Sequence, residues 1–383
     1  MRILFLPSWY PSKATPYVGD FIQRHARAAA LYNDVYVLHV AKVTDPHLKT
    51  PTEEIQREGN CTEHIIYNRR GLLPVGGKIL SIFHYYYLHR KYLDNYIREY
   101  GLPDVVHVHV PIKAGLVALW LQRKYNLKFA VTEHYTIYND TERERYSTRP
   151  VWFRHYTRKV VQRCSALIPV SDELGRAMNK YVIRKDFQVV PNAVDSARFS
   201  YTDPPEGRFR FIHVSNMVPR KNVEGIIDAI ALLYRENPNV ELLLVGAETD
   251  AVKNHAMKTG LVDKAIFFKG EVPYEAVAGY MSNAHALVLN SFMENMPCVV
   301  LESLCSGRPV VATRVGGTPE VVNDLSGLLV EPGNTPELIQ AMKSMMLQYT
   351  NYDLRAISRN ATALYSYEKV GAMLTDIYRK LSS

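Results

Sequence analysis

A strand, a helix and a second strand follow one another in residues 286–313, which read ALVLNSFMENMPCVVLESLCSGRPVVAT. Ala286–Asn290 and Pro309–Thr313 are short and apolar, as buried strands are. Pro297 is suited to the first turn of the helix between them, and Gly307 is suited to its end. Because apolar strands that alternate with helices form parallel sheets covered on both faces, this stretch predicts an α/β fold.

The same alternation recurs along the rest of the chain. It predicts two Rossmann-like, doubly wound parallel-sheet domains in series, with the carboxyl ends of their strands facing a shared cleft, where such sheets bind ligands. We place the N-terminal domain at residues 1–190, a Pro- and Gly-rich linker at 191–208, and the C-terminal domain at 209–363. The other strands are expected at Arg2–Leu6, Val35–Val40, His64–Tyr67, Asp104–Val110, Phe129–His134, Ala166–Val170, Gln188–Val190, Arg210–Ser215, Glu241–Val245, Ile266–Lys269 and Gly327–Val330.

The net charge of this 383-residue chain is +8 and is unevenly shared. Residues 1–190 contain 28 Lys and Arg against 17 Asp and Glu, whereas residues 191–383 contain 18 against 21. No helix-turn-helix, zinc spacing or aromatic single-strand platform supports a nucleic-acid partner. A basic N-terminal half that faces an anionic lipid leaflet or a phosphorylated acceptor is one interpretation, and a generally basic surface is the other.

The cysteines and the N-terminus favour a cytoplasmic protein. Cys61, Cys164, Cys298 and Cys305 show neither C-x-x-C spacing nor a paired pattern, which is typical of a reducing compartment. Met1–Leu6 is followed by Pro7 before a signal-peptide core could form, and therefore reads as a buried strand.

Two glutamates flank the start of the helix at Pro297. Glu302 lies eight residues beyond Glu294, which allows up to about 12 Å along a helix axis. Carboxylates so spaced could grip hydroxyls at opposite ends of an extended ligand, while the helix N-terminus offers N–H groups to an anion. A nucleotide sugar has the three matching groups, namely ribose hydroxyls, a diphosphate and sugar hydroxyls. The alternative is that Glu302 is a solvated helix residue and Glu294 an ordinary loop acid.

Several further segments make the chain resemble the family-4 retaining glycosyltransferases of GT-B architecture. The E-x7-E pair is followed by SGRPVVAT at 306–313 and by VGGTPE at 315–320. Leu242–Gly246, Phe268–Val272 and Pro191–Asp195 also match, with Ala193 where the family usually has glycine. The resemblance covers nearly the whole chain and implies that residues 364–383 include a helix that crosses back to the N-terminal domain.

The resemblance also implies roles for individual residues. It implies that Glu302 binds the donor ribose, that Glu294 lies beside the transferred sugar, and that Lys221 neutralises the departing diphosphate. It implies that His134 contacts the donor sugar, so that Glu294, Lys221 and His134 form the catalytic set. The other implied donor-binding residues are Arg220, Gly19, Asn216, Asn295, Met296, Pro297, Cys298 and Val299, and the implied cleft-lining residues are His109, Gly316 and Gly317.

The chain departs from the family pattern at two of these positions. Asn216 stands where the family usually has a basic residue, and Arg220 either replaces it or is a surface residue. Gly19 is single where the family usually has a double glycine.

Metal binding is a separate question. His107 and His109 form an H-x-H pair on one strand, but we find no third ligand, and strand histidines are more often hydrogen-bonded core residues. There is no D-x-D sequence, and Lys221 and a helix N-terminus are available for the phosphates. We therefore expect neither a metal nor another cofactor.

These features predict a retaining, metal-independent glycosyltransferase. The donor is expected to be a nucleotide-diphosphate sugar, with UDP as the first expectation and GDP as the second, and the acceptor to be a hydroxyl of a glycan or a lipid-linked molecule. In this scheme the leaving phosphate accepts the proton of the acceptor. The alternatives are a sugar-nucleotide epimerase or phosphorylase of the same architecture, or a non-catalytic protein that binds nucleotide sugars.

An aromatic and basic helix at Lys78–Tyr92 bears on the acceptor. One interpretation is that an apolar face of this helix lies on the inner surface of the cytoplasmic membrane and presents a lipid-linked acceptor. The other is that the face packs on the sheet of its own domain. A second aromatic and basic stretch, Trp152–Lys159, favours the membrane. The residues expected near the apolar face are Ile79, Ile82, Phe83, Tyr86, Leu93 and Ile97.

Overall fold

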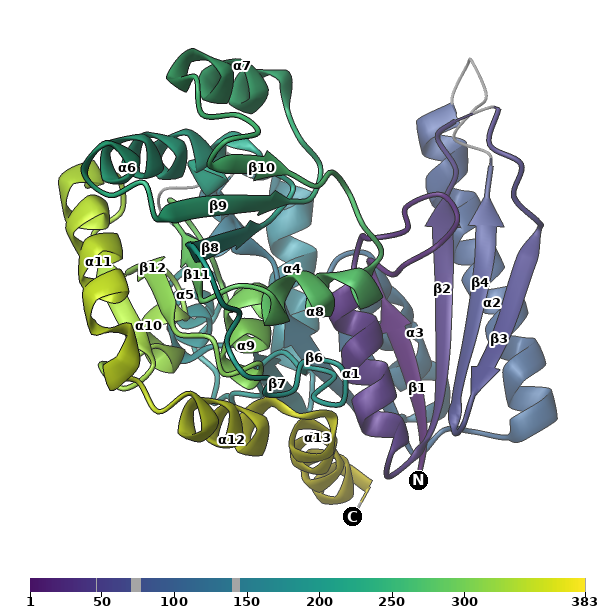
Figure 1. Ribbon diagram of the computed structural model, residues 1–383. Coiled ribbons are helices and arrows are strands. Elements are labelled where there is room, and N and C mark those ends of the chain that lie inside the picture. Colours follow the sequence, from purple (N-terminus) through teal and green to yellow (C-terminus); the bar gives the residue numbers. More distant parts are fainter. Residues whose placement is uncertain (46, 70–76, 140–144, 383) are drawn as a thin grey trace. The chain divides into compact units, whose positions relative to one another are not determined.

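The computed structural model describes residues 1–45, 47–69, 77–139 and 145–382, with the side chains of 77–79 left out. The chain forms two compact units, which are described separately (Figure 1). Unit 1 comprises Met1–Ala193 and Tyr367–Ser383, and unit 2 comprises Val194–Ser366. Each unit is an α/β structure built on a largely parallel sheet, so the predicted fold class of two parallel-sheet domains is confirmed.

Unit 1 contains a seven-stranded sheet in the order β3-β4-β2-β1-β5-β6-β7. Its apolar strands are buried because helices cover both faces. The strands are β1 (Arg2–Pro7), β2 (Asp34–Lys42), β3 (Glu53–Glu58), β4 (Cys61–Asn68), β5 (Val105–His109), β6 (Phe129–Glu133) and β7 (Ala166–Pro169). The helices are α1 (Asp20–Ala30), α2 (Gly77–Tyr100), α3 (Ala114–Tyr125), α4 (Val151–Arg163), α5 (Asp172–Tyr181) and α13 (Tyr367–Ser382), with short 3₁₀ helices at Thr136–Tyr138 and Tyr146–Thr148.

The last helix of the chain belongs to unit 1, as predicted. Helix α13 packs on α1 so closely that a Cβ at Gly371 would lie 2.1 Å from the carbonyl oxygen of Ala28. The amide of Asn33 donates to the hydroxyl of Thr375 over 2.8 Å, and the Tyr378 hydroxyl lies 2.6 Å from His107 Nδ1. The helix therefore completes the core on the α1 side of the first sheet.

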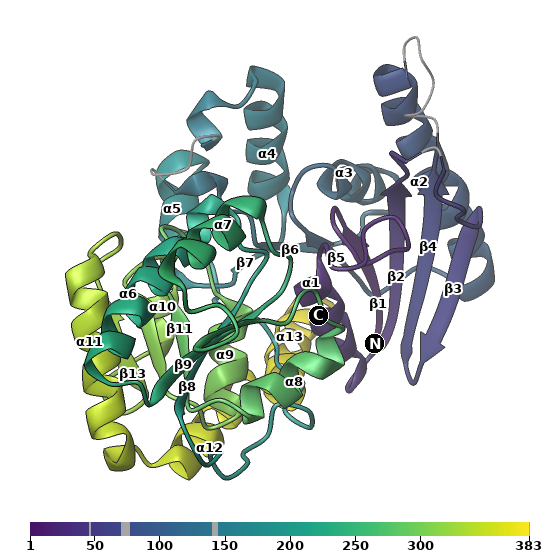
Figure 2. The same cartoon turned by 45° about the horizontal axis from the view of Figure 1, so that its top comes forward.

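Unit 2 contains a six-stranded parallel sheet in the order β10-β9-β8-β11-β12-β13. Helices α6, α7 and α11 lie on one face, while α8, α9 and α12 lie on the other (Figure 2). The strands are β8 (Phe209–Val214), β9 (Val240–Val245), β10 (Ile266–Phe268), β11 (Ala286–Leu289), β12 (Val310–Thr313) and β13 (Gly327–Val330). The helices are α6 (Val223–Glu236), α7 (Asp250–Thr259), α8 (Tyr274–Ser282), α9 (Cys298–Cys305), α10 (Thr318–Val321), α11 (Thr335–Gln348) and α12 (Leu354–Tyr365), with 3₁₀ helices at Pro219–Lys221 and Tyr349–Asn351.

Strand order reverses once in each sheet. In unit 1 the reversal lies between β1 and β5, and in unit 2 it lies between β8 and β11. Open α/β sheets bind ligands beyond the carboxyl ends of the strands at such a switch point. The loops that follow these four strands are therefore where a site is expected.

Two strand predictions in unit 1 were wrong. Gln188–Val190 is not a strand, although its backbone N–H groups at 188 and 190 donate to Leu167 and Pro169 beside β7. Strand β3 was missed because its sequence, EEIQRE, is almost entirely polar and exposed. It pairs antiparallel with β4 at the sheet edge, where charged residues are typical because they oppose edge-to-edge aggregation.

The apolar face predicted for α2 is also corrected, because only part of it is buried in the structure. Leu93 is fully buried, but Ile82 and Phe83 are 55% and 71% exposed. Farther along α2, the exposed Arg90 lies over the Trp120 ring of α3. The buried face of α2 instead comprises Ser81, Tyr85, Leu88, His89, Tyr92, Leu93 and Tyr96; the side chain of Ile79 lies outside the described part of the chain, and Tyr86 and Ile97 are half-buried.

None of the helices in the described ranges has the length and apolar character that crossing a bilayer requires.

Candidate active site

Lys221 and Glu294 meet at the switch point of unit 2. Lys221 ends the 3₁₀ helix after β8, and Glu294 lies in the loop after β11, the strand beside β8. Lys221 Nζ donates to Glu294 Oε1 over 2.5 Å, and the two side chains are only 15% and 11% exposed. The sequence therefore identified two residues that are distant along the chain but form a nearly buried ion pair.

The loop that carries Lys221 is fixed by backbone contacts. Met217 is buried in the left-handed region at φ 47°, and its N–H donates to Ser215 Oγ over 3.0 Å. Farther along, the N–H of Phe292 donates to the carbonyl of Arg220 over 2.8 Å. The backbone bond from Phe292 thus joins the loop after β11 to the loop after β8 next to the ion pair.

A buried histidine supports the same loop. The Val288 carbonyl lies 2.9 Å from His213 Nδ1 and can only accept, so Nδ1 carries the proton. His213 Nε2 then accepts from the Ser215 hydroxyl over 2.7 Å. Burial, with a smaller contribution from the charge of Lys221, lowers the pKa of His213 to about 4. His213 is therefore neutral at pH 7 and acts as a structural hydrogen-bonding group.

A chain of hydroxyl groups orients Glu294. The Ser291 hydroxyl donates to Glu294 Oε1 over 2.7 Å, and Ser291 is fully buried. The Thr313 hydroxyl, at the end of β12, donates to the Ser291 carbonyl over 2.6 Å. Glu294 Oε1 therefore accepts from both Ser291 and Lys221, which fixes its carboxylate. Neither Ser291 nor Thr313 was predicted as a site residue from the sequence, although Ser291 follows a predicted strand and Thr313 ends one.

The glycine pair lies against the Glu294 loop. Gly316 has φ +53°, and the N–H of Gly317 donates to the Asn295 carbonyl over 2.5 Å. The loop after β12 thus contacts the backbone at Glu294 and Asn295 rather than forming an isolated turn.

Helix α9 presents an uncapped N-terminus beside Glu294. Pro297 is the N-cap residue and no side chain caps the helix. Cys298 and Val299 are half-exposed, whereas Asn295, Met296 and Pro297 are buried. Glu302 is 4% exposed, so it is not the solvated helix residue that the alternative interpretation required.

The structure separates Arg220 and Asn216 from the ion pair. Both residues are exposed. Within the described ranges, no hydrogen bond or ion pair is formed by the Arg220 side chain, although its backbone carbonyl accepts from Phe292. Arg220 therefore does not take part in the Lys221–Glu294 contact.

The predicted residues of unit 1 lie at its own switch point. His109 ends β5, and His134 follows β6 directly. His109 Nδ1 lies 3.1 Å from His134 Nε2, and the rings are stacked. Gly19 follows β1 at φ +81°, where a Cβ would lie 2.7 Å from the backbone of Trp9. The backbone approach at Gly19 therefore requires glycine, whatever ligand it serves.

A third histidine that the sequence analysis missed completes this group. Nitrogen atoms of His25, His109 and His134 all lie within 4.8 Å of one another, and all three side chains are buried. Burial lowers the pKa of His25 to about 4 and holds the pKa values of the other two well below 6.5. His25 lies on α1, so no local spacing in the sequence links it to the H-x-H pair.

Glu133 fixes the backbone beside His134. Its Oε1 accepts from the N–H groups of His134 and Tyr135 over 2.8 and 2.9 Å, and its Oε2 accepts from the Tyr138 hydroxyl over 2.8 Å. Burial raises the pKa of Glu133 to about 7. This residue orients His134 and was not identified from the sequence.

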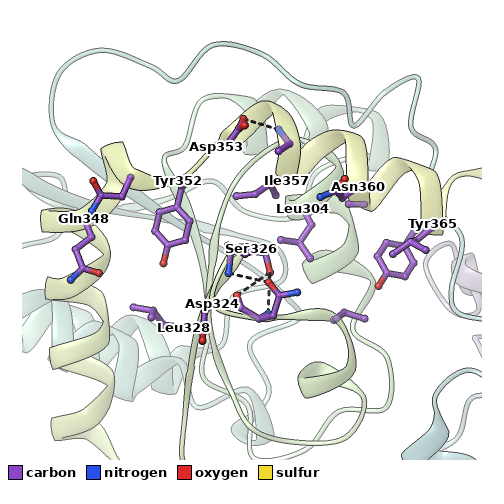
Figure 3. Close-up of a pocket in the computed structure, with 17 residues that line it drawn as sticks. Leu304, Asp324, Ser326, Leu328, Gln348, Tyr352, Asp353, Ile357, Asn360 and Tyr365 are labelled. Atoms are coloured by element: carbon purple, nitrogen blue, oxygen red, sulfur yellow. Dashed lines mark hydrogen bonds between the residues drawn. The ribbon is translucent and has the colours of Figure 1, made fainter.

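A separate pocket of about 470 Å³ lies in unit 2 away from the ion pair (Figure 3). It is lined by the segment before β13, the end of α9 and helix α12. Tyr352 and Tyr365 stand at its two ends, with Leu304 and Ile357 between them. Of the residues that the structure describes, no Lys, Arg or His lines the pocket. It therefore lacks the positive charge that a diphosphate requires, and it lies at the amino ends of the strands.

Comparison with known sequences identifies both halves of the chain. Residues 25–198 match the profile described as Glycosyltransferase Family 4, and residues 197–363 match the profile described as Glycosyl transferases group 1. A protein of Bacillus subtilis described as a teichuronic acid biosynthesis glycosyltransferase is 24% identical over 97% of this chain and 94% of its own length. An uncharacterised glycosyltransferase of Methanocaldococcus jannaschii is 27% identical over 75% of this chain and 78% of its own.

Solved structures share the fold over the full length. Sucrose-phosphate synthase from Thermosynechococcus elongatus superposes with a TM-score of 0.79 at 20% identity, covering 100% of this chain and 99% of the other. Anabaena HepE, solved in complex with UDP, gives a TM-score of 0.74 at 17% identity, covering 99% and 100%. Together with the two sequence profiles and the two parallel-sheet units, these similarities show that the chain belongs to the family-4 glycosyltransferases and has the GT-B fold.

Proposed function

We propose that this glycosyltransferase transfers a sugar from a nucleotide-diphosphate sugar to a hydroxyl group, with retention of the anomeric configuration. The observation that carries the proposal is the Lys221–Glu294 ion pair at the switch point of unit 2. A cation and a carboxylate beside a helix N-terminus supply the groups that a diphosphate and a sugar need. The acceptor is a glycan or a lipid-linked molecule.

Lys221 neutralises the departing diphosphate in this proposal. Among the described residues, its ammonium group donates to one carboxylate, that of Glu294. A diphosphate at the N-terminus of α9 would bring further negative charge within reach of that ammonium. Preorganised positive charge where negative charge develops is a large contribution to catalysis. The phosphates then need no metal ion.

Glu294 and Glu302 position the rest of the donor. Glu294 is fixed by Ser291 and Lys221, so its second carboxylate oxygen is available to a sugar hydroxyl. Glu302 is assigned to the ribose hydroxyls. In unit 1, His134 is assigned to the transferred sugar, and Glu133 fixes the backbone from which it projects.

The reaction requires no base from the protein. The bond between the anomeric carbon and the diphosphate oxygen breaks, and its electron pair remains on the diphosphate. The acceptor oxygen forms a bond to the anomeric carbon on the same face. The acceptor proton passes to the oxygen of the leaving phosphate. Glu294 is therefore a positioning residue and not a nucleophile.

UDP is the first donor nucleotide to test, and GDP is the second. The structure of Anabaena HepE contains UDP, and a further structure of it contains UDP-glucose. Transfer is measured with UDP- and GDP-sugars, and the product anomer is assigned by NMR. Glu294→Ala and Lys221→Ala should each nearly abolish transfer while the protein remains folded. Full activity in either variant would refute the assignment. Product analysis with and without an acceptor distinguishes transfer from epimerisation and phosphorolysis.

We further propose that unit 1 contacts an anionic membrane through exposed side chains of two helices. This α2–α4 surface comprises Ile82, Phe83 and Tyr87 of α2 and Val151, Trp152 and Tyr156 of α4. Burial and, to a smaller extent, Tyr156 of α4 raise the pKa of Tyr86 of α2 to about 12, so these two side chains lie within electrostatic range of each other. Exposed Arg90, Lys91 and Arg158 lie on the same helices. Apolar side chains with flanking bases are typical of membrane-surface helices.

We also propose a cytoplasmic location at the inner face of the membrane, where the free cysteines Cys61, Cys164, Cys298 and Cys305 would stay reduced.

A further inference from the structure

Three histidines from separate elements of unit 1 converge on one point. His25 comes from α1, His109 from the end of β5, and His134 from the residue after β6. One nitrogen from each lies within 4.8 Å of the other two. His25 and His109 are fully buried, and His134 is 9% exposed. Three possible ligand atoms on a helix and at two strand ends are therefore close together. The group is buried, with His134 nearest to the surface.

His25 is oriented as a metal ligand would be. Its Nε2 lies 3.0 Å from the Pro191 carbonyl, which can only accept, so the ring proton is on Nε2. Nδ1 then carries a lone pair, is buried, and has no hydrogen-bond partner in the described ranges. Histidine ligands commonly donate their other N–H to a backbone carbonyl, which fixes the tautomer and directs the free lone pair at the ion.

His109 also has a nitrogen without a partner. Its Nδ1 lies 3.1 Å from His134 Nε2, and its Nε2 is buried and makes no hydrogen bond within the part of the chain that the structure describes. The centroid of the His25 ring lies 5.6 Å from the centroid of the His109 ring and 5.4 Å from that of the His134 ring. Leaving a buried polar nitrogen unsatisfied costs about 1–3 kcal/mol. A ligand that accepts lone pairs from this group would recover part of that cost.

We propose that His25, His109 and His134 bind one divalent transition-metal ion of the zinc class. Three imidazole nitrogens are the ligand set of tetrahedral zinc sites that leave the fourth position to water. The group offers no oxygen ligand, which disfavours Mg²⁺ and Ca²⁺. Binding leaves all three imidazoles neutral, but it requires the His109–His134 hydrogen bond to open, because the ring that accepts in that bond has no second lone pair for the ion.

The ion would inhibit sugar transfer. Binding occupies a nitrogen of His134 that the proposed function assigns to the donor sugar, so this effect rests on the proposed function. The binding itself does not, because it needs only the three rings. The site is distinct from the diphosphate, for which the proposed function uses Lys221.

The test is equilibrium dialysis of the chelator-treated full chain against Zn²⁺, with metal counted by mass spectrometry. His25→Gln and His109→Gln remove one ligand each. His39→Gln is the matched control, because His39 is also buried in unit 1 and also bonds a backbone carbonyl, that of Pro7, over 3.1 Å. Loss of an outer partner alone weakens metal binding roughly 10- to 100-fold, so loss of a ligand should weaken it at least that much.

We expect one ion per chain in the wild type and in His39→Gln, and at least a 100-fold weaker affinity in the two ligand variants. X-ray absorption of the zinc-loaded wild type, which needs no variant to fold, should show three histidine nitrogens around the ion. The proposal is overturned by the absence of stoichiometric binding, by unchanged affinity in the ligand variants, or by sulfur ligands from cysteine.

The same samples separate this site from the proposed function. Zn²⁺ should inhibit transfer in the wild type and His39→Gln with the affinity found by dialysis. Stoichiometric binding without any transfer in metal-free protein would refute the proposed function and leave the metal site intact. Sugar transfer by a protein that binds no metal would refute the metal site and leave the proposed function intact.

Discussion

Gly316 lies so close to Glu294 that a Cβ at position 316 would be 1.9 Å from the carbonyl oxygen of Glu294. The backbone at 316 is also in the left-handed region, at φ +53°. The loop after β12 therefore fixes the main chain of the residue whose side chain holds Lys221. The geometry of the ion pair depends on a position that touches neither charged group.

Gly316→Ala should lose most of the transfer activity. The added methyl group has to displace the Glu294 backbone, and the left-handed conformation adds strain, so we expect destabilisation of about 2–4 kcal/mol. Gly260→Ala is the matched control, because Gly260 also has positive φ (+68°) but has open space around its Cβ position. Urea unfolding and transfer rates are measured for both variants. Equal activities in the two variants would show that the contact with Glu294 is irrelevant.

Ser291→Ala should reduce kcat about 10- to 100-fold, because Glu294 keeps Lys221 but its charged carboxylate loses a hydrogen bond worth about 1.5–3 kcal/mol. Ser358→Ala serves as the control. The Ser358 hydroxyl is also buried and donates to a backbone carbonyl, that of Cys305, over 2.5 Å. Both variants are compared by steady-state kinetics and by unfolding. If Ser291→Ala loses stability but its kcat falls no more than that of Ser358→Ala, the Ser291 hydroxyl serves folding alone.

The sequence predicted most of the fold, but it could not predict the partners of the candidate site residues. Buried strands were recognised from their short apolar runs, and the E-x7-E and glycine motifs located Glu294 and Gly316. The adjacency of β8 and β11, which brings Lys221 to Glu294, follows from sheet order and leaves no local pattern. His25 was missed for the same reason. Strand β3 was missed because an exposed edge strand carries no apolar periodicity.

Stability should fall as the pH drops from 6.5 toward 4, partly through His213. Its folded pKa of about 4 lies below the usual 6.5, so the unfolded chain takes up the proton first. The stabilisation is complete above pH 6.5 and is lost as the pH falls, by about 3 kcal/mol for this group alone. Between pH 7 and pH 4, the free energy of unfolding of His213→Gln, measured with urea, should therefore fall by about that amount less than the free energy of unfolding of the wild type. Parallel pH curves for the two proteins would refute this assignment.

The α2–α4 surface should bind anionic vesicles. Sedimentation with phosphatidylserine-containing liposomes at low salt is expected to recover the wild type, and binding should weaken with salt because the bases contribute. The double variant Phe83→Ser and Trp152→Ser should bind at least about 10-fold less, since both side chains insert into the interface. Leu347→Ser, which changes a 76% exposed leucine of unit 2, is the control. Absence of wild-type binding at low salt would remove the membrane proposal.

The most direct test of the donor site is calorimetric titration of UDP, and then of GDP, into the wild type, Lys221→Ala and Lys343→Ala. Lys343 forms an exposed ion pair with Glu236 in the same unit and serves as the matched control. We predict that one nucleotide binds the wild type and Lys343→Ala equally, and binds Lys221→Ala about 10- to 100-fold more weakly, because one charge-assisted contact to phosphate is lost. Equal affinity for wild type and Lys221→Ala, or no binding of either nucleotide to the wild type, would contradict the account.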